Sequence, residues 1–542
     1  MSRHWIRSYD KGVPEDIDAD AYASVVELLD EACKTFPDLP AFECFGAQMT
    51  YAQLDAAARN VAAYLQTKLG VTRGDRIALM CPNIFAFPVA MLGILRAGAT
   101  QVNVNPLYTP RELEHQLSDA GAETIMIFAG STPTLGAIVA RTPVKTVVTI
   151  DLGDGMGLPI PTPPADPAIA DPIPMAQMLS EGADLPFDPV ALTGDDTLFF
   201  QYTGGTTGLS KGAVLTHRNL VANSEQFRAY LPEASEPGKE VVVGALPLYH
   251  IFGLTLSLVY LAIGGKIVLI PNPRDMDAFI ASIKDSKFSV MAGVNTLFAG
   301  LCMHPAFRDV DFSNYKVSIG GGAAVLEATS NAWKDITGHH IKEGYGLSET
   351  SPILTINPMS VTHFTGACGL PVSSTDIKLL DENDQEVALG ERGEICAAGP
   401  QIMKGYWNRE DANTEAFTKD GYFRTGDIGT FDEEGYLRIV DRKKDMILVS
   451  GFNVYPNEVE AVVALHPAVA ENACIGIPDA KTGEAVHVFV VTKPSVELEE
   501  DDIIDFCKDH LAAYKVPKGM TFLSELPKSN VGKILRRELR NL

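Results

Sequence analysis

Residues 197–219 read Thr-Leu-Phe-Phe-Gln-Tyr-Thr-Gly-Gly-Thr-Thr-Gly-Leu-Ser-Lys-Gly-Ala-Val-Leu-Thr-His-Arg-Asn. The apolar run 198–201 predicts a buried strand, and 216–219 predicts a helix N-cap and first turn. Between them, glycines let the backbone fold around phosphate oxygens, while hydroxyls and the Lys211 ammonium supply donors and positive charge. A Walker A loop needs Gly before its Lys, and Ser210 stands there, which disfavours a P-loop NTPase. The stretch therefore predicts a different phosphate-binding loop, with a flexible surface turn as the alternative.

The surrounding chain alternates short apolar runs with helical patterns. Residues 76–81, 124–128 and 146–150 predict strands, and 109–120 predicts a helix because Pro110 suits a first turn. This alternation predicts α/β layers with largely parallel sheets. Two regions depart from it. Nine prolines in residues 159–189 predict a surface connection without helix or central strand, and 420–442 predicts glycine-punctuated hairpins.

Length, charge and cysteine spacing argue against several classes of protein. The chain has 542 residues, which suggests about three to four structural units. Its net charge of −25 argues against non-specific nucleic-acid binding. Eight cysteines without CxxC spacing disfavour zinc and redox motifs and favour a reducing cytosol. The first twelve residues lack the apolar run of a secretory signal. Residues 241–265 carry no Asp, Glu, Lys or Arg, yet their Pro and Gly predict strand, turn and buried helix instead of a membrane span.

Further motifs follow in order along the chain. A carboxylate in 343–350 (Glu-Gly-Tyr-Gly-Leu-Ser-Glu-Thr) suits Mg²⁺ beside a triphosphate, and Asp427 in Thr425-Gly-Asp suits two ribose hydroxyls. Each motif alone also fits a plain turn with a solvated acid. The remaining motifs are 246–253 (Leu-Pro-Leu-Tyr-His-Ile-Phe-Gly), 320–324 (Gly-Gly-Gly-Ala-Ala), 438–444 (Arg-Ile-Val-Asp-Arg-Lys-Lys) and 527–533 (Pro-Lys-Ser-Asn-Val-Gly-Lys).

Taken together, these motifs resemble the adenylate-forming superfamily of acyl-CoA synthetases, luciferases and peptide-synthetase adenylation domains. The segments 101–115, 449–456 and 528–540 look most like bacterial long-chain-fatty-acid–CoA ligases. The resemblance covers essentially the whole chain. It implies a large N-terminal AMP-binding and acyl-binding domain, 1–443, of layered α/β subdomains with a small β-barrel-like subdomain. It also implies a small mobile α+β C-terminal lid domain, 444–542, with its boundary at the charged run 441–445 and its hinge at Lys444.

The resemblance assigns roles residue by residue. Lys533 carries the catalytic ammonium, Glu349 and Thr203 hold Mg²⁺, His250 and Glu349 are catalytic, and Gly451 lines the CoA path. The nucleotide is bound by Thr203, Gly204, Gly205, Thr206, Thr207, Lys211, Gly321, Gly322, Ala323, Tyr345, Gly346, Ser348, Asp427, Ile439 and Arg442. The acyl pocket is lined by Phe252, Val294, Asn295, Thr296 and Phe298. The chain departs from the family at Gly204, Ser210 and Ser348, where Ser, Pro and Thr are usual.

The implied function is ATP- and Mg²⁺-dependent activation of a long-chain fatty acid to acyl-CoA through an acyl-adenylate, releasing pyrophosphate and AMP. No aspartate lies in 246–254, which disfavours an amino-acid substrate. A medium-chain, aryl or sulfur-containing acid is the nearer alternative, and a non-catalytic acyl-binding protein is the more distant one. The resemblance implies a cytoplasmic enzyme, and leaves open peripheral contact with the inner membrane surface and a homodimer. A solvated amphipathic helix is favoured for the basic tail, because the net charge of −25 repels anionic lipid.

Overall fold

The computed structural model describes residues 3–203, 210–450, 452–493, 496, 498–529 and 534–542. Its internal contacts divide the chain into two compact units. The large unit comprises Tyr9–Asp376 and Ala398–Ala416, and the small unit comprises Met1–Ser8, Ile377–Ala397 and Phe417–Leu542. This division groups residues 377–397 and 417–443 with the C-terminal residues. A boundary at 443/444 with a hinge at Lys444 stays a prediction.

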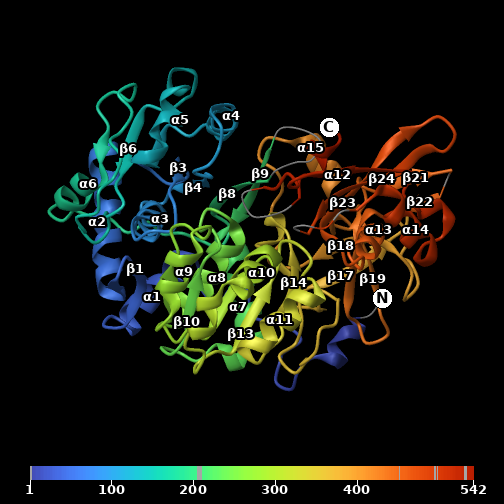
Figure 1. Cartoon of the computed structure of the whole chain (residues 1–542). Helices are drawn as coiled ribbons and strands as arrows, with labels where there is room; N and C mark the ends of the chain where they lie inside the picture. The colour runs from blue at the N-terminus through green and yellow to red at the C-terminus, as the bar shows by residue number, and fades with distance from the viewer. Residues whose placement is uncertain (1–2, 204–209, 451, 494–495, 497, 530–533) are drawn as a thin grey trace. The chain divides into compact units, whose positions relative to one another are not determined.

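The two strands on either side of the glycine-rich stretch, β8 and β9, belong to a seven-stranded sheet of the large unit (Figure 1). The strands pair in the order β7-β6-β5-β3-β4-β8-β9, all parallel except the antiparallel β8–β9 pair. Their apolar side chains pack into one core with helix α4. The predicted strands at 76–81, 124–128, 146–150 and 198–201 are thereby confirmed. The bounds are β3 (Arg76–Met80), β4 (Thr100–Asn103), β5 (Thr124–Phe128), β6 (Thr146–Ile150), β7 (Ile173–Pro174), β8 (Thr197–Thr203) and β9 (Lys211–Thr216).

A second, nine-stranded sheet of the large unit carries or leads into three of the other motifs, 246–253, 320–324 and 343–350. Its order is β16-β15-β14-β13-β12-β10-β11-β1-β2, with β1 and β10–β14 parallel and the outer pairs antiparallel. The bounds are β1 (Pro40–Cys44), β2 (Ala47–Thr50), β10 (Val241–Gly244), β11 (Lys266–Leu269), β12 (Val290–Gly293), β13 (Val317–Gly320), β14 (Lys342–Gly346), β15 (Ile353–Ile356) and β16 (Leu370–Pro371).

Several helices of the large unit, α4 among them, begin at a residue whose side chain caps the first turn. Thr109 and Glu112 form a capping box, Pro110 opens the helix and Gly121 ends it with a positive φ, which confirms the predicted helix. Residues 241–265 form β10 and the buried α8, also as predicted. The bounds are α1 (Val25–Thr35), α2 (Tyr51–Leu69), α3 (Ala86–Arg96), α4 (Pro110–Ala120), α5 (Thr132–Gly136), α6 (Met175–Gly182), α7 (His217–Tyr230), α8 (Ile251–Leu261), α9 (Met276–Ile283), α10 (Asn295–Met303), α11 (Glu327–Thr337) and α12 (Glu410–Ala416).

The proline-rich stretch 159–189 corrects one expectation. It was predicted to contain no helix, yet α6 occupies Met175–Gly182. The sequence has no proline between Pro174 and Pro186, and a proline just before a helix leaves the helical hydrogen bonds intact. The prolines themselves lie outside the helix, and β7 with Pro174 sits at an edge of its sheet, where a missing N–H costs little.

The small unit contains two mainly antiparallel sheets and three α-helices among its described residues. One sheet has the order β17-β18-β19-β20, and its β19–β20 pair forms the predicted hairpin. The other has the order β22-β21-β24-β23, with β25 parallel to β24. The bounds are β17 (Asp376–Leu380), β18 (Gly393–Ala398), β19 (Phe423–Phe431), β20 (Leu437–Arg442), β21 (Ile447–Val449), β22 (Phe452–Val454), β23 (Val469–Asp479), β24 (Gly483–Thr492), β25 (Gly519–Phe522), α13 (Pro456–Val463), α14 (Glu500–His510) and α15 (Arg536–Leu539).

The cysteines are all free thiols. Seven are buried and Cys302 is half-buried, where burial raises the pKa of its thiol to about 11. Cys474 and Cys507 lie in the core of the small unit, whereas Cys33, Cys44 and Cys81 lie in the large unit. Among the helices that the structure describes, none has both the length and the apolar character needed to cross a membrane.

Candidate active site

The glycine-rich loop starts and ends on paired strands. Thr203 closes β8 and faces Lys211, the first residue of β9, across the antiparallel pair. Gly204, Gly205, Thr206 and Thr207 lie outside the described residues. The returning chain is held from α4, because His115 Nε2 lies 2.9 Å from the carbonyl oxygen of Ser210. Thr216 and Asn219 then form the capping box that starts α7, as predicted.

A segment far along the sequence pairs with β9. The N–H of Val214 donates to the Gly405 carbonyl at 2.9 Å, and the N–H of Trp407 donates to the Gly212 carbonyl at 2.8 Å. Gly405 has φ +142, in the region that favours glycine, and a Cβ there would lie 2.9 Å from Asn413 Oδ1. Because of this pairing, Tyr406 lies next to the start of β9, where Lys211 stands.

Tyr406 brings two predicted site residues together. Its hydroxyl donates a hydrogen bond of 2.7 Å to Glu349 Oε1, and the Lys211 ammonium lies 5.2 Å from the centre of its ring. Glu349 stands in the short 3₁₀ turn Ser348–Thr350 and is 7% exposed. Burial, with the neighbouring Glu349 carboxylate, raises the pKa of Tyr406, so the hydroxyl keeps its proton and remains a donor.

Tyr406 is the functional candidate that the sequence reasoning missed. It lies 57 residues from Glu349, beyond the reach of any local motif spacing. The available signal was the Gly-Tyr-Trp run at 405–407, in which glycine frees the backbone directly before two large aromatic residues.

The predicted adenine and acyl motifs also meet within the large unit. Gly321 follows β13, and a Cβ placed on it would lie 2.9 Å from Cε1 of the Phe252 ring. Gly346 ends β14, and a Cβ there would overlap the Pro352 carbonyl oxygen at 1.8 Å. The backbone overlap means that position 346 requires glycine, whereas a Cβ on Gly321 would press on the Phe252 ring. Tyr345 lies in β14 and is 7% exposed, and Gly322 and Ala323 follow Gly321 in the turn before α11.

The remaining predicted acyl residues lie at helix starts. His250 caps α8, and its Nδ1 accepts the Phe252 N–H at 3.3 Å. Asn295 opens α10, and its Oδ1 accepts the Leu326 N–H at 2.9 Å, while Val294 is the residue before the helix and Thr296 its second residue. Phe298 is fully buried and packs against Trp333 with ring centres 4.8 Å apart, so it belongs to the core.

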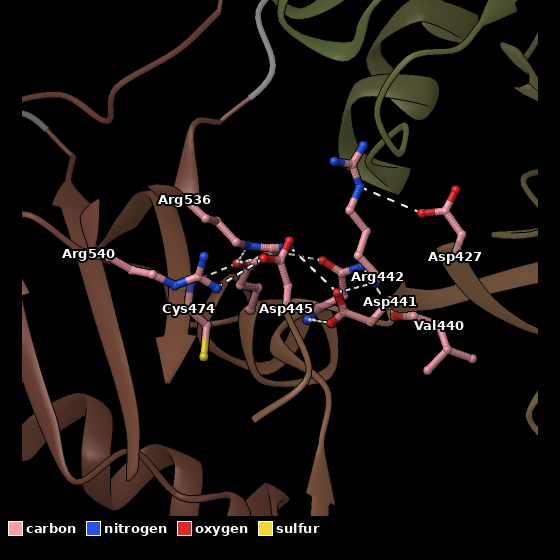
Figure 2. Close-up of polar contacts among 10 residues, drawn as sticks. Asp427, Val440, Asp441, Arg442, Asp445, Cys474, Arg536 and Arg540 are labelled. Atoms are coloured by element: carbon pink, nitrogen blue, oxygen red, sulfur yellow. Dashed lines mark hydrogen bonds and ion pairs between the residues drawn. The ribbon is translucent and has the colours of Figure 1, made fainter. Parts of the chain in front are cut away.

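The predicted ribose motif lies in the small unit. Asp427 on β19 and Arg442 on β20 are cross-strand partners, and Arg442 Nε lies 3.6 Å from Asp427 Oδ1 (Figure 2). The Thr425 hydroxyl accepts the Asp427 N–H at 3.1 Å and donates to the Ile395 carbonyl at 2.8 Å, which fixes the turn. Ile439 on β20 is 40% exposed. A carboxylate and a partly exposed guanidinium are thus presented side by side.

A second charged cluster surrounds Arg536 of α15. Its guanidinium contacts Glu460 at 2.8 Å, Asp445 at 3.4 Å and Asp441 at 3.6 Å (Figure 2). Arg540 contacts Asp445 at 3.0 Å. Burial raises the pKa of the fully enclosed Asp441 to about 6 against the attraction of Arg536. The expectation of a solvated basic tail is wrong for Arg536, because buried carboxylates attract its guanidinium into the unit, whereas Arg540 stays exposed while it pairs with Asp445.

The predicted catalytic lysine, Lys533, lies outside the described residues, as does Gly451. The chain on either side of Lys533 is fixed. Lys528 pairs with Ile534 in a β-bridge, the Leu535 N–H donates to the Pro527 carbonyl at 2.8 Å, and Lys528 forms an ion pair with Glu471 at 2.6 Å. Lys444, the predicted hinge, is an exposed residue in the turn between β20 and β21.

The residues fit a magnesium ion held partly by substrate. Within the part of the chain that the structure describes, no three His, Cys, Asp or Glu side chains gather as a metal site. A dedicated protein cage for a metal is therefore missing from that part. Mg²⁺ is often bound by one or two carboxylates together with phosphates and water, and the buried carboxylate of Glu349 fits such a ligand.

Known proteins match the chain over nearly its full length. The family model for "AMP-binding enzyme" matches residues 29–407, and that for "AMP-binding enzyme C-terminal domain" matches 458–533. A long-chain-fatty-acid–CoA ligase of Salmonella typhimurium is 48% identical, with 100% of this chain and 98% of that protein covered. ATP-bound MatB from Rhodopseudomonas palustris aligns with a TM-score of 0.84 at 30% identity, covering 95% of this chain and 98% of that one. The anthranilate CoA ligase AuaEII, in complex with anthranoyl-AMP, aligns with a TM-score of 0.85 at 25% identity, covering 97% and 98%.

Proposed function

The chain belongs to the AMP-binding enzyme family, and on that premise we propose that it joins a long-chain fatty acid to coenzyme A at the expense of ATP. The products are acyl-CoA, AMP and pyrophosphate. The structural observation that carries the proposal is the convergence of Lys211 and the buried Glu349 carboxylate on Tyr406, next to the glycine-rich loop. A cation and a metal-binding anion beside a phosphate loop suit the triphosphate of ATP.

The first half-reaction forms an acyl-adenylate. A carboxylate oxygen of the acid attacks the α-phosphorus of ATP, and the bond to pyrophosphate breaks. The Lys211 ammonium attracts the triphosphate. The Asp427 carboxylate accepts hydrogen bonds from the ribose hydroxyls, and the Arg442 side chain extends to the ribose. Lys533 offsets the charge that develops at the α-phosphate, so catalysis is mainly positioning and electrostatics. Bound Mg²⁺, held by Glu349 with Thr203, would neutralise phosphate oxygens.

The second half-reaction transfers the acyl group. The sulfur of CoA, after losing its proton, attacks the acyl carbonyl carbon and AMP leaves. We propose that a lid domain, 444–542, turns about Lys444 between the two steps and that Gly451 lines the path of the thiol, a gating motion of a common kind. Lys444→Pro should slow thioesterification more than adenylation. Rapid-quench measurement of both steps tests this, and equal losses would contradict it.

The long-chain substrate is supported by full-length similarity to a ligase whose name states that substrate. The wall residues Phe252 and Val294 are apolar, as an alkyl chain requires. An aryl acid is the second candidate, favoured by the likeness to the anthranilate CoA ligase. A panel of acids distinguishes the two, because each CH₂ of an alkyl chain that is buried contributes about 0.8 kcal/mol to the free energy of binding.

The decisive experiment measures pyrophosphate release from ATP and Mg²⁺ with acids of graded length, with and without CoA. Long-chain acids should give CoA-dependent turnover that collapses in Lys533→Ala. Arg537→Ala is the matched control, because this exposed cation lies four residues away and outside the charged cluster. Release with aryl acids alone would show that the substrate is an aryl acid and would leave the proposed adenylation reaction unchanged. No release with any acid would contradict the proposal.

The proposal also includes contact with a membrane surface and assembly into a homodimer. Long-chain acids partition into bilayers, so we propose peripheral contact with the inner membrane surface, tested by cosedimentation with anionic and zwitterionic vesicles. Arg536 and Arg540 already pair with acids inside the small unit, which points to contact through other residues. A homodimer is the assembly to test by sedimentation equilibrium.

A further inference from the structure

We infer that Tyr406 is a positioning residue that holds Glu349 and Lys211 in place for a magnesium-bound triphosphate. The inference rests on the proposed function and extends it to a residue outside the motifs discussed above. It stands on contacts within the large unit: one hydrogen bond to the carboxylate, one cation–ring contact and backbone pairing on both sides of Tyr406.

The backbone of Tyr406 is fixed first. The strand-like pairing of 404–407 with β9 places Tyr406 opposite Ala213, and the Tyr406 N–H donates to Asn413 Oδ1 at 2.6 Å. The Asn413 amide in turn donates to the Tyr406 carbonyl at 3.0 Å. A side chain on a backbone held from two sides has little freedom to move, which is what a positioning residue needs.

The same segment holds Glu349 at two points. The Met403 N–H donates to the Glu349 carbonyl at 2.8 Å, and the Tyr406 hydroxyl donates to the Glu349 carboxylate at 2.7 Å. Main chain and side chain of the proposed metal ligand are thus both tied to residues 403–406. A neutral hydroxyl orients the carboxylate and leaves its negative charge for a cation, whereas a lysine or arginine in that place would cancel it.

The ring of Tyr406 serves the other partner. The Lys211 ammonium lies 5.2 Å from the ring centre, within the range of a cation–π contact. This contact holds Lys211 against the same ring whose hydroxyl binds Glu349. One side chain therefore sets the relative positions of an anion that suits Mg²⁺ and a cation that suits phosphate.

The test measures binding without turnover. The probe is adenosine 5′-(α,β-methylene)triphosphate, which cannot release pyrophosphate, titrated calorimetrically with Mg²⁺ and again with EDTA. Tyr406→Phe keeps the ring and the β9 pairing but removes the hydroxyl. We expect about tenfold weaker binding in Mg²⁺ and unchanged binding in EDTA, because the lost bond joins a charged partner. Tyr406→Leu, which also removes the ring, should weaken binding in EDTA as well.

Tyr202→Phe is the matched control. Tyr202 is a buried tyrosine on β8, the strand paired with β9, and its hydroxyl donates to a carboxylate, Asp119, at the same 2.7 Å. Thermal unfolding of the free proteins corrects for any loss of stability. We expect the control to keep the Mg²⁺ dependence of the unaltered protein.

The possible results separate the two claims. Wild-type Mg²⁺ dependence in Tyr406→Phe, or equal weakening with Mg²⁺ and EDTA, would overturn the inference and leave the proposed function standing. Weakening in the Tyr202→Phe control as large as in Tyr406→Phe would also overturn it. If the unaltered protein binds the probe without any effect of Mg²⁺, or does not bind it, the inference and the metal-assisted part of the proposed function fail together.

Discussion

Two acidic regions of the molecule use their carboxylates in opposite ways. In the large unit, Glu349 is oriented by the neutral hydroxyl of Tyr406, with the Lys211 ammonium on the ring face. In the small unit, Asp441, Asp445 and Glu460 surround the guanidinium of Arg536. A hydroxyl fixes a carboxylate without neutralising it, while a guanidinium neutralises it as well. The first arrangement suits a ligand cation, and the second stabilises the fold.

The largest effect should come from removing the central cation of the small unit. Arg536→Met leaves buried acids without their main partner, and breaking such a pair costs about 3–5 kcal/mol. Hydrogen exchange of the full-length protein should show faster exchange in α13 and β23. Arg537→Met is the control, because this neighbour is exposed. Unchanged protection in Arg536→Met would show that the cluster does not hold the unit together.

The second prediction concerns the stability of the large unit at acid pH, because burial of the His217 imidazole disfavours its charged form. His217 is 1% exposed, its Nδ1 accepts the Val25 N–H at 3.1 Å, and burial lowers its pKa to about 4. The unfolded chain binds this proton near pH 6.5 and the folded chain only near pH 4. Stability should therefore fall by roughly 3 kcal/mol as the pH drops through that window.

The measurement is urea unfolding followed by tryptophan fluorescence, since Trp333 and Trp407 report on the large unit. His217→Asn keeps an acceptor for the Val25 N–H and cannot take up a proton, so its stability should change less between pH 7 and 4. Equal pH slopes for the two proteins would show that His217 does not control the loss.

Asp427 combines the two arrangements, because this acid of the small unit lies beside a partly exposed arginine and is also proposed to bind a ligand. If it accepts ribose hydroxyls, Asp427→Asn should weaken ATP binding about tenfold. Binding of 2′,3′-dideoxy-ATP, which lacks those hydroxyls, should be nearly the same in both proteins. An equal loss for both nucleotides would instead indicate that Asp427 acts through Arg442 or the fold.

The smallest effect is expected at an exposed pair. Lys528 and Glu471 lie 2.6 Å apart, but both are about one-third exposed, and such pairs contribute only about 0–1 kcal/mol. Lys528→Ala should change the melting temperature little, and differential scanning calorimetry will measure it. A loss approaching that of Arg536→Met would mean that exposure does not separate the two kinds of ion pair.

The parts of the fold that could be predicted are those with local signals. Residues 124–128 and 146–150 are short runs rich in apolar and β-branched residues, and Thr109, Pro110 and Glu112 mark a helix start within four residues. The helix α6 was missed because proline content was averaged over a window, whereas helix formation depends on where each proline stands.

The candidate site was predictable only where a motif is continuous. Lys211 and Glu349 could be picked out from their own segments, but their meeting at Tyr406 depends on strand pairing between residues about 190 apart in sequence. The burial of Arg536 could not be predicted for the same reason. A sequence shows four charges, and only the fold shows that Asp441, Asp445 and Glu460 lie around one guanidinium.

The buried free thiols make it possible to measure how fast each unit of the protein opens. A thiol reagent needs both access and a thiolate, and burial denies the first while raising the pKa values of Cys33, Cys44 and Cys396 to about 12. Alkylation of Cys474 and Cys507 can therefore time the opening of the small unit, while Cys33, Cys44 and Cys81 time that of the large unit. Peptide mass spectrometry of one labelled sample would read both rates at once, with and without nucleotide.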